Sequence, residues 1–179
     1  MMKTLRKKIW TACLALMIAI AMAVPAFAAP TYAVCPLHPN SSSPNYMNLY
    51  GNSSSVAGRY ITLYDPTTDK HPLGDDQFVN KMSATIDGRS GVYLTFRGNT
   101  QYAINRHSTS TRAFMYPYPA GAYDSVFSDF NSEGSVYLLA GSHKGQYLGW
   151  ESDSNFANVY FDRGGSNWEW EYLPGKDVK

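Results

Sequence analysis

The sequence predicts an all-β chain built from repeats of a four-strand unit. The clearest unit lies at residues 134–173, where four short runs rich in β-branched and aromatic residues are each bounded by Gly, Ser, Asn or Asp. Such runs, separated by turn residues, are typical of β-strands, and nothing in the unit places apolar residues at helical spacing over three turns. The four predicted strands are residues 135–140, 146–151, 158–162 and 168–173.

Two further units of the same kind precede this one along the chain. Residues 32–35 provide a short first strand for the first unit, and the second unit starts at Gly91. Tyr46, Tyr102 and Tyr147 open the second strand of each unit and recur at separations of 56 and 45 residues. Repetition of this kind indicates a repeat architecture. The aligned segments are 46–51, 102–107 and 147–152 for the second strand, 59–65, 112–118 and 158–164 for the third, and 75–79, 123–127 and 166–170 for the fourth.

Three four-strand units of about 40 residues each predict a β-trefoil. In this fold six strands form a barrel and three hairpins cap it with pseudo-threefold symmetry, and closure of the barrel removes free sheet edges. The alternative is a βγ-crystallin-like Greek key, which also uses four-strand units of this size. Those units occur in pairs, so an odd count of three favours the trefoil.

The first 28 residues have the pattern of a secretory signal peptide. A basic start is followed by the apolar run 9–24 and by Ala26-Phe27-Ala28, a small-x-small cleavage site. The apolar part is short and ends at Pro25 and the cleavage site, unlike a membrane-spanning helix. The sequence therefore predicts a signal peptide at 1–28, a domain at 29–174 and a polar tail at 175–179. We expect the mature chain to be secreted and not inserted in a membrane.

The charge of the predicted mature chain argues against nucleic acid as a partner. The signal segment holds four of the 15 Lys and Arg and none of the 14 Asp and Glu, which leaves residues 29–179 with a formal charge of −3. No basic patch remains that would attract nucleic acid or an anionic membrane.

Cysteine usage leaves a single thiol in the mature chain. The sequence has two cysteines, and Cys13 lies in the signal segment. Cys35 therefore has no partner for a disulfide within the chain, and such a thiol either pairs between molecules or stays free. We favour a buried Cys35.

The fourth-strand segments carry a resemblance to a known family. In the ricin B-type β-trefoil lectins each repeat ends in a Gln-x-Trp motif, whose Trp packs in the shared core. Here the corresponding segments read Gln77-Phe78-Val79, Ser125-Val126-Phe127 and Trp168-Glu169-Trp170. The first keeps the Gln and the third keeps the Trp, so residues 31–173 resemble that family with degenerate motifs. The resemblance implies the β-trefoil fold.

The same resemblance implies a shallow sugar pocket in each unit. Sugar hydroxyls form hydrogen bonds with an amide or carboxylate on the second strand and with an Asn or Asp before the Gln-x-Trp motif. An aromatic side chain at the end of the third strand stacks on the sugar ring. By position, the candidate carbohydrate-binding residues are Asn48, Tyr64, Asp76 and Gln77 in the first unit, and Asn105, Tyr116 and Asp124 in the second.

The third unit departs from this pattern. Its corresponding residues are Gly149, Asp162 and Asn167, and we expect no working pocket there because Gly149 has no side chain and Asp162 is not aromatic. Asn48 and Asn105 also stand where galactose-binding members of the family carry Asp. A neutral amide forms weaker hydrogen bonds with hydroxyls than a charged carboxylate does. We therefore expect general carbohydrate binding rather than galactose specificity.

The candidate residues also have purely structural interpretations. Tyr64 and Tyr116 lie close to prolines at strand ends and can cover the end of the barrel. The two asparagines can be strand-end amides, and Asp76 and Asp124 can cap turns by accepting backbone N–H groups.

Catalysis and cofactor binding are not predicted. The four histidines are scattered without metal-ligand spacing, no Gly-x-Ser-x-Gly elbow is present, and no Gly-rich phosphate loop is present. Neighbouring acidic residues do not by themselves form the separated pair that acid–base chemistry needs. The histidines are His38, His71, His107 and His143.

Two functions follow from these expectations. The first is a secreted, non-enzymatic, lectin-like module that binds a glycan or polysaccharide through its first two units. The second is a trefoil scaffold that has lost sugar binding and binds a protein partner, as an inhibitor or adhesion factor does. Aromatic, loop-rich surfaces suit both kinds of partner.

Overall fold

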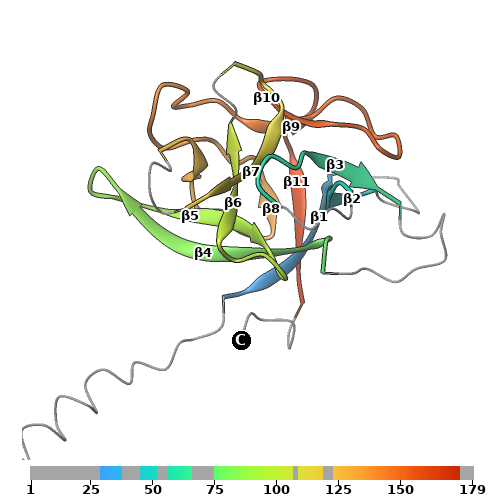
Figure 1. The fold of residues 1–179 in the computed structure, drawn as a ribbon, viewed down its shortest axis with the longest axis horizontal. Coiled ribbons are helices and arrows are strands. Elements are labelled where there is room, and N and C mark those ends of the chain that lie inside the picture. The colour runs from blue at the N-terminus through green and yellow to red at the C-terminus, as the bar shows by residue number, and fades with distance from the viewer. Residues whose placement is uncertain are drawn as a thin grey trace, which may run out of the picture.

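The computed structural model describes residues 29–37, 45–51, 56–65, 75–106, 109–118 and 123–173. Within these residues the chain forms eleven β-strands and one short 3-10 turn, with no α-helix, and Figure 1 shows the strands wrapped around a common centre. The predicted signal peptide, the C-terminal tail and three of the four histidines lie outside the described residues. These histidines are His38, His71 and His107.

A strongly curled sheet forms the barrel (Figure 1). Its strand order is β5-β4-β1-β11-β8, and antiparallel bridges from Val92 to Phe127 and from Phe127 to Leu138 close the ring between β5 and the segment after β8. The bounds of these strands are β1 (Thr31–Pro36), β4 (Phe78–Ile86), β5 (Arg89–Phe96), β8 (Glu133–Gly134) and β11 (Trp168–Tyr172).

Three two-stranded hairpins complete the fold. Single bridges join every pair of hairpins, and they link Tyr60 to Phe114, Thr62 to Asn158, and Arg112 to Tyr160. This triangle of contacts is the expected pseudo-threefold cap, so the predicted all-β trefoil is confirmed over the Greek key alternative. The hairpins consist of β2 (Tyr46–Leu49) with β3 (Ile61–Tyr64), β6 (Tyr102–Arg106) with β7 (Ala113–Pro117), and β9 (Leu148–Trp150) with β10 (Val159–Phe161).

Two predicted strands are less regular than expected. Residues 123–127 form the 3-10 turn η1 (Tyr123–Ser125) and a single bridge at Phe127, and residues 135–140 contribute only isolated bridges. Between these two segments, the buried Phe130 stacks on Trp170 with ring centroids 3.8 Å apart. Asp129 supports this local turn by accepting a hydrogen bond from the Phe130 N–H (2.7 Å).

The degenerate motif segments fill equivalent places in the core. Their third residues, Val79, Phe127 and Trp170, are all at most 1% exposed. Their first residues are also buried, and each forms a hydrogen bond with the hairpin of its own unit. Gln77 Nε2 donates to Tyr64 O (3.5 Å), Asn105 Nδ2 donates to Ser125 Oγ (2.7 Å), and Trp168 Nε1 donates to Leu148 O (3.0 Å).

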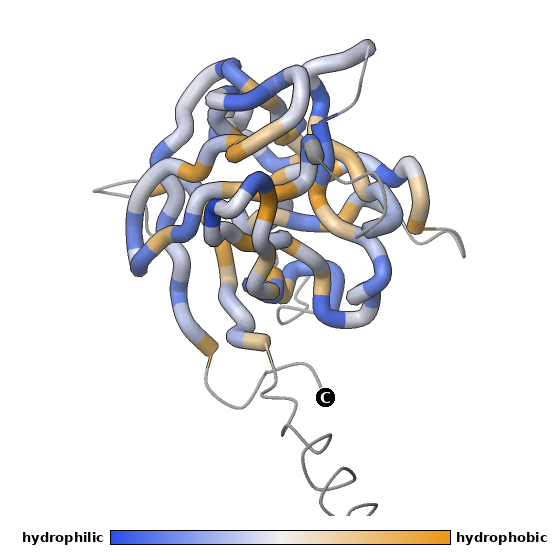
Figure 2. Tube along the Cα trace, turned by 90° about the vertical axis from the view of Figure 1, so that its left-hand side faces the viewer, coloured by the Kyte–Doolittle hydropathy of each residue, from blue (hydrophilic) through white to orange (hydrophobic). Residues whose placement is uncertain are grey.

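Hydrophobic segments of the chain lie toward the interior (Figure 2), and aromatic rings there pair with one another. Trp150 and Trp168 meet edge to face at 4.7 Å, and Phe127 stacks on Phe161 at 6.1 Å. Such pairs add about 0.5–1.5 kcal/mol each beyond the burial of their area. The first of these pairs lies within the third unit, and the second joins the second unit to the third.

Cys35 lies on β1 and is buried, as expected. Burial raises the pKa of its thiol to about 12, and the carboxylates of Glu169 and Glu171 add to the increase. Because the thiolate is the reactive form, Cys35 in the folded chain is unreactive at neutral pH. Pairing between molecules would require this strand to open.

Trp170 is the largest of the three buried residues that end the motif segments, and its truncation tests the packing. We expect Trp170→Ala to lower the free energy of unfolding by about 3–5 kcal/mol, because it leaves a cavity against Phe130 and Tyr32. Urea denaturation followed by tryptophan fluorescence measures this. Tyr172→Ala, at an exposed position two residues further along β11, is the matched control, and an equal loss in both variants would contradict the assignment.

Candidate functional site

Hairpin register places the candidate residues of each unit on one face. In the first unit Asn48 pairs with Thr62, and Tyr46 pairs with Tyr64. Since side chains alternate across a strand, these residues share the face opposite the core. The core face carries buried aliphatic side chains from Met47, Leu49, Ile61 and Leu63.

The fourth-strand segment brings Asp76 and Gln77 to the same hairpin. Asp76 O accepts a hydrogen bond from Leu49 N (2.8 Å), and the buried Gln77 amide reaches Tyr64 O. The structure therefore groups Asn48, Tyr64, Asp76 and Gln77 around hairpin β2–β3. Of these, the carboxylate is exposed and the tyrosine is half-buried.

Arg59 stabilises this end of the hairpin. Its Nε donates to Tyr50 O (2.8 Å) and its Nη2 to Leu49 O (3.0 Å). The pKa of the Asp76 carboxyl is raised by partial desolvation, which the positive charge of Arg59 opposes and the neighbouring Asp75 reinforces. Asp76 is thus an acceptor whose protonation begins at a higher pH than that of an ordinary aspartate.

The second unit repeats the arrangement with less accessible polar groups. Asn105 and Tyr116 share one face of hairpin β6–β7, since their strand partners are Phe114 and Ala103. Tyr116 is 42% exposed, but Asn105 is only 7% exposed, and its amide nitrogen is bonded to Ser125. The aromatic ring of this candidate site is exposed to solvent, whereas the amide is buried and its nitrogen is used in a structural hydrogen bond.

Asp124, the remaining candidate of the second unit, contacts a residue of the third unit. His143 Nδ1 lies 3.1 Å from Asp124 Oδ2, and both side chains are largely buried. The other oxygen, Asp124 Oδ1, is buried without a hydrogen-bond partner in the described residues. The sequence contained no signal for His143, because the contact depends on how two units meet.

The third unit has no room at the equivalent place. A Cβ on Gly149 would lie 2.5 Å from Gly165 O and 2.6 Å from Arg163 O, so the chain after β10 packs directly on this strand. Asp162 Oδ1 accepts a hydrogen bond from the Tyr147 N–H (2.8 Å), and Asn167 Oδ1 accepts one from the Ser135 hydroxyl (2.9 Å). These polar groups form hydrogen bonds within the structure.

Phe156 is a further aromatic residue at the first-unit site, and it was not among the predicted site residues. It comes from the third unit, is 55% exposed, and its ring lies 5.4 Å from that of Tyr64 with an interplanar angle of 57°. Its φ of 63° is uncommon for a bulky side chain and costs on the order of 1–3 kcal/mol. Only the juxtaposition of two distant units identifies it.

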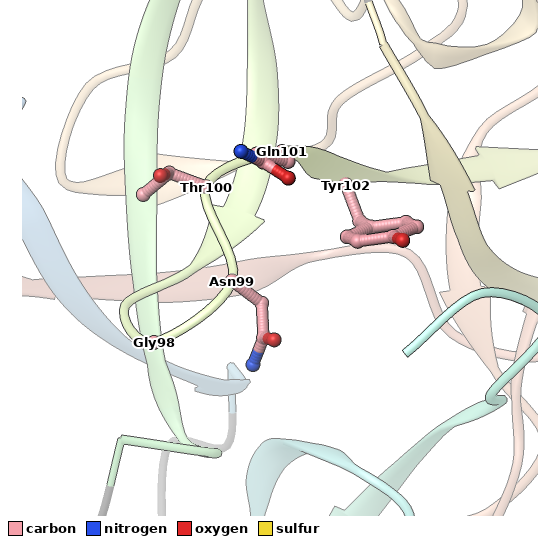
Figure 3. A pocket seen from close by; sticks show the side chains of 5 residues that line it. All are labelled: Gly98, Asn99, Thr100, Gln101 and Tyr102. Carbon is pink, nitrogen blue, oxygen red and sulfur yellow. The ribbon is translucent and has the colours of Figure 1, made fainter. Parts of the chain in front are cut away.

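A small pocket of about 220 Å³ lies at the turn between β5 and β6. Figure 3 shows Thr100 on the opposite side of the turn from Tyr102. None of the predicted site residues lines this pocket. Its lining residues are Gly98, Asn99, Thr100, Gln101 and Tyr102.

The described part of the chain holds neither a metal cluster nor a membrane-spanning helix. There, no three His, Cys, Asp or Glu side chains lie close enough together to hold a metal ion. Over the same ranges, no helix has the length and apolar character needed to cross a bilayer.

Comparison with known proteins identifies the fold. No family model and no curated protein matches the sequence, but solved structures match it. The C-half of an earthworm R-type lectin, solved with GalNAc, has 12% identity and a TM-score of 0.55, with 80% of this chain and 99% of that one covered. A Polyporus squamosus lectin bound to Neu5Acα2-6Galβ1-4GlcNAc has 10% identity and a TM-score of 0.55, over 82% and 50%.

The third neighbour is an enzyme. A GlcNAcα1-4Gal-releasing endo-β-galactosidase from Clostridium perfringens has 11% identity and a TM-score of 0.55, with 80% of this chain covered. The match covers 32% of the enzyme, so this chain spans about a third of its length. At identities this low the likeness concerns architecture, and it confirms the expected resemblance at that level: the chain has the β-trefoil fold of the R-type, or ricin B-like, lectins.

Proposed function

We propose that this protein is a secreted, non-enzymatic, lectin-like module that binds glycans through its first and second units. The observation that carries the proposal is the first-unit cluster, where Tyr64, Asn48 and Asp76 gather on the outer side of one hairpin. A pyranose has an apolar C–H face and a rim of hydroxyls, and an aromatic ring with nearby amide and carboxylate groups complements both.

The two units contribute unequally in this proposal. The first offers an exposed carboxylate, Asp76, on the same hairpin as Tyr64, whereas in the second the exposed Tyr116 provides mainly stacking. Each site is shallow and weak alone. Two sites on one rigid barrel gain effective concentration on a multivalent glycan, which favours a polysaccharide or clustered glycan as the ligand.

The structural neighbours support the proposal by analogy. The earthworm and Polyporus lectins were solved with bound sugars, and the part of the Clostridium enzyme that resembles this chain is a minor share of that protein. A glycan-binding role is compatible with a chain that acts alone, as well as with a chain that acts beside a catalytic domain. Fold analogy alone does not establish function, so the proposal depends on the cluster at Tyr64.

The aromatic residues provide the direct test of glycan binding. We expect residues 29–179, displayed multivalently on a glycan array, to bind a defined set of glycans, and Tyr64→Ala with Tyr116→Ala to abolish this binding because both stacking surfaces are removed. Circular dichroism and Tm of the double variant control for folding. Absence of binding by the folded parent chain would overturn the proposal and favour the protein-binding scaffold.

The Asp76 carboxylate gives glycan binding a pH dependence in this proposal. Its charged form accepts the sugar hydroxyls, and its raised pKa means that affinity falls as the pH is lowered, starting above the range of an ordinary aspartate. We expect Asp76→Asn to bind about three- to tenfold more weakly at neutral pH and to lose this acid dependence. A parent chain whose affinity is flat down to the unfolding pH would contradict the role of Asp76.

Export rests on the N-terminal segment and has its own test. We expect expression of the full chain in a bacterial host to release a mature form into the periplasm or medium, with Ala29 as its first residue, because Ala26-Phe27-Ala28 fits a signal-peptidase site. N-terminal sequencing decides this. Retention of the full-length chain in the membrane fraction would contradict secretion.

A further inference from the structure

The loop between β9 and β10, residues 151–158, extends from the third unit to the first. Four hydrogen bonds hold it against hairpin β2–β3, so its position beside Tyr64 is fixed by the fold. They run from Phe156 N to Leu63 O (2.8 Å), from Leu63 N to Ala157 O (2.8 Å), from Asp65 N to Asn155 Oδ1 (3.1 Å), and from Asn45 Nδ2 to Asp153 O.

The pseudo-threefold symmetry provides a reference for this loop. In the equivalent contact between the first and second units, Gly58 N donates to Met115 O (2.9 Å) and Met115 N donates to Arg59 O (2.8 Å). Gly58 therefore corresponds to Phe156. Both have left-handed backbones, with φ of 79° and 63°. A glycine takes this conformation without steric cost, whereas a phenylalanine does not.

The fold itself gives no reason for a phenylalanine at this position. The side chain is 55% exposed, so it contributes little to the core, and glycine would serve the backbone better. Its ring instead lies against Tyr64, on the face that also carries Asn48. Strained residues of this kind cluster at functional sites, and exposed aromatic rings are typical of recognition surfaces.

We propose that Phe156 and Tyr64 form one binding platform, which makes the first-unit site specific for glycans of at least two consecutive sugars. This inference rests on the proposed glycan binding. Two rings with centroids 5.4 Å apart and tilted by 57° present two adjoining faces to a bent chain of sugars. One sugar stacks on Tyr64, within reach of Asp76 and Asn48, and the next contacts Phe156.

The second-unit site differs in this respect. Tyr116 corresponds to Tyr64, since each directly follows the strand residue that bonds to the neighbouring loop, Met115 or Leu63. The neighbouring loop offers Gly58 there, where a Cβ would meet no atom within 4 Å. Tyr116 therefore has no ring at the position equivalent to Phe156, and the ring beside it is that of Phe114 from its own hairpin, at 6.1 Å.

The decisive variant is Phe156→Gly, made in a Tyr116→Ala background so that only the first-unit site is measured. The probes are galactose, lactose and 6′-sialyllactose, and N-acetylglucosamine, chitobiose and chitotriose, titrated by isothermal calorimetry or saturation-transfer NMR. We expect the parent site to bind the longer members of one series more tightly than the monosaccharide. Phe156→Gly should weaken the longer members about three- to tenfold and change the monosaccharide less than twofold, while its Tm stays equal or rises.

Three comparisons separate the possible results. Phe156→Tyr should retain the preference for longer glycans, and Tyr172→Ala, an exposed aromatic change outside the site, should have no effect. If binding depends on Tyr64 but Phe156→Gly leaves the length preference intact, the platform is wrong and the lectin proposal stands. If the folded parent binds no probe in either series and no glycan on the array, both are overturned.

Discussion

Each hairpin of this barrel is attached to the fourth-strand segment of its own unit through the first residue of that segment, which is buried in all three units. The contact is made by Gln77, Ser125 or Trp168, three chemically different side chains at one position of the repeat. A buried polar group needs a hydrogen-bond partner, and the partner differs with the residue. Gln77 bonds to the backbone carbonyl of Tyr64, Ser125 to the side-chain amide of Asn105, and Trp168 to the backbone carbonyl of Leu148. The attachment persists although the motif does not.

The motif residues can differ between units because the two faces of each hairpin have different roles. One face carries aliphatic side chains into the core, where volume and packing decide, and the other face carries the residues available for recognition. Because alternate residues serve the two faces, the outer side chains can diverge with little effect on the core. The third unit illustrates the limit of this freedom. There Gly149 lets the backbone at Gly165 pack onto the strand, and the recognition face is converted into an internal contact.

The sequence was sufficient for the trefoil, and the hairpins that it predicted have a register that places Asn48 with Tyr64 and Asn105 with Tyr116 on one face. Hairpins are local structures, so the runs of β-branched and aromatic residues and the turn residues between them indicated the hairpins directly. The stacking of Phe130 on Trp170 was not predictable, because the two residues lie 40 positions apart in the chain and belong to different units. His143 and Phe156 were missed for the same reason. Each acts on a neighbouring unit, and a sequence aligned unit by unit contains no information about contacts between units.

Contacts between units make the outer faces of the three similar units differ from one another. The backbone geometry that joins one unit to the next is shared by Gly58 and Phe156, yet only one of them carries a side chain onto the neighbouring face. A left-handed backbone favours glycine, so a phenylalanine retained there against its steric cost indicates that its ring has a use outside the core. The same reasoning applies to Asp124, whose carboxylate is engaged by His143 across a unit boundary, whereas Asp76 remains exposed. Contacts at the unit boundaries thus leave the Asp76 carboxylate of the first unit exposed, and in the proposed function it is this unit that offers aromatic, amide and carboxylate groups together.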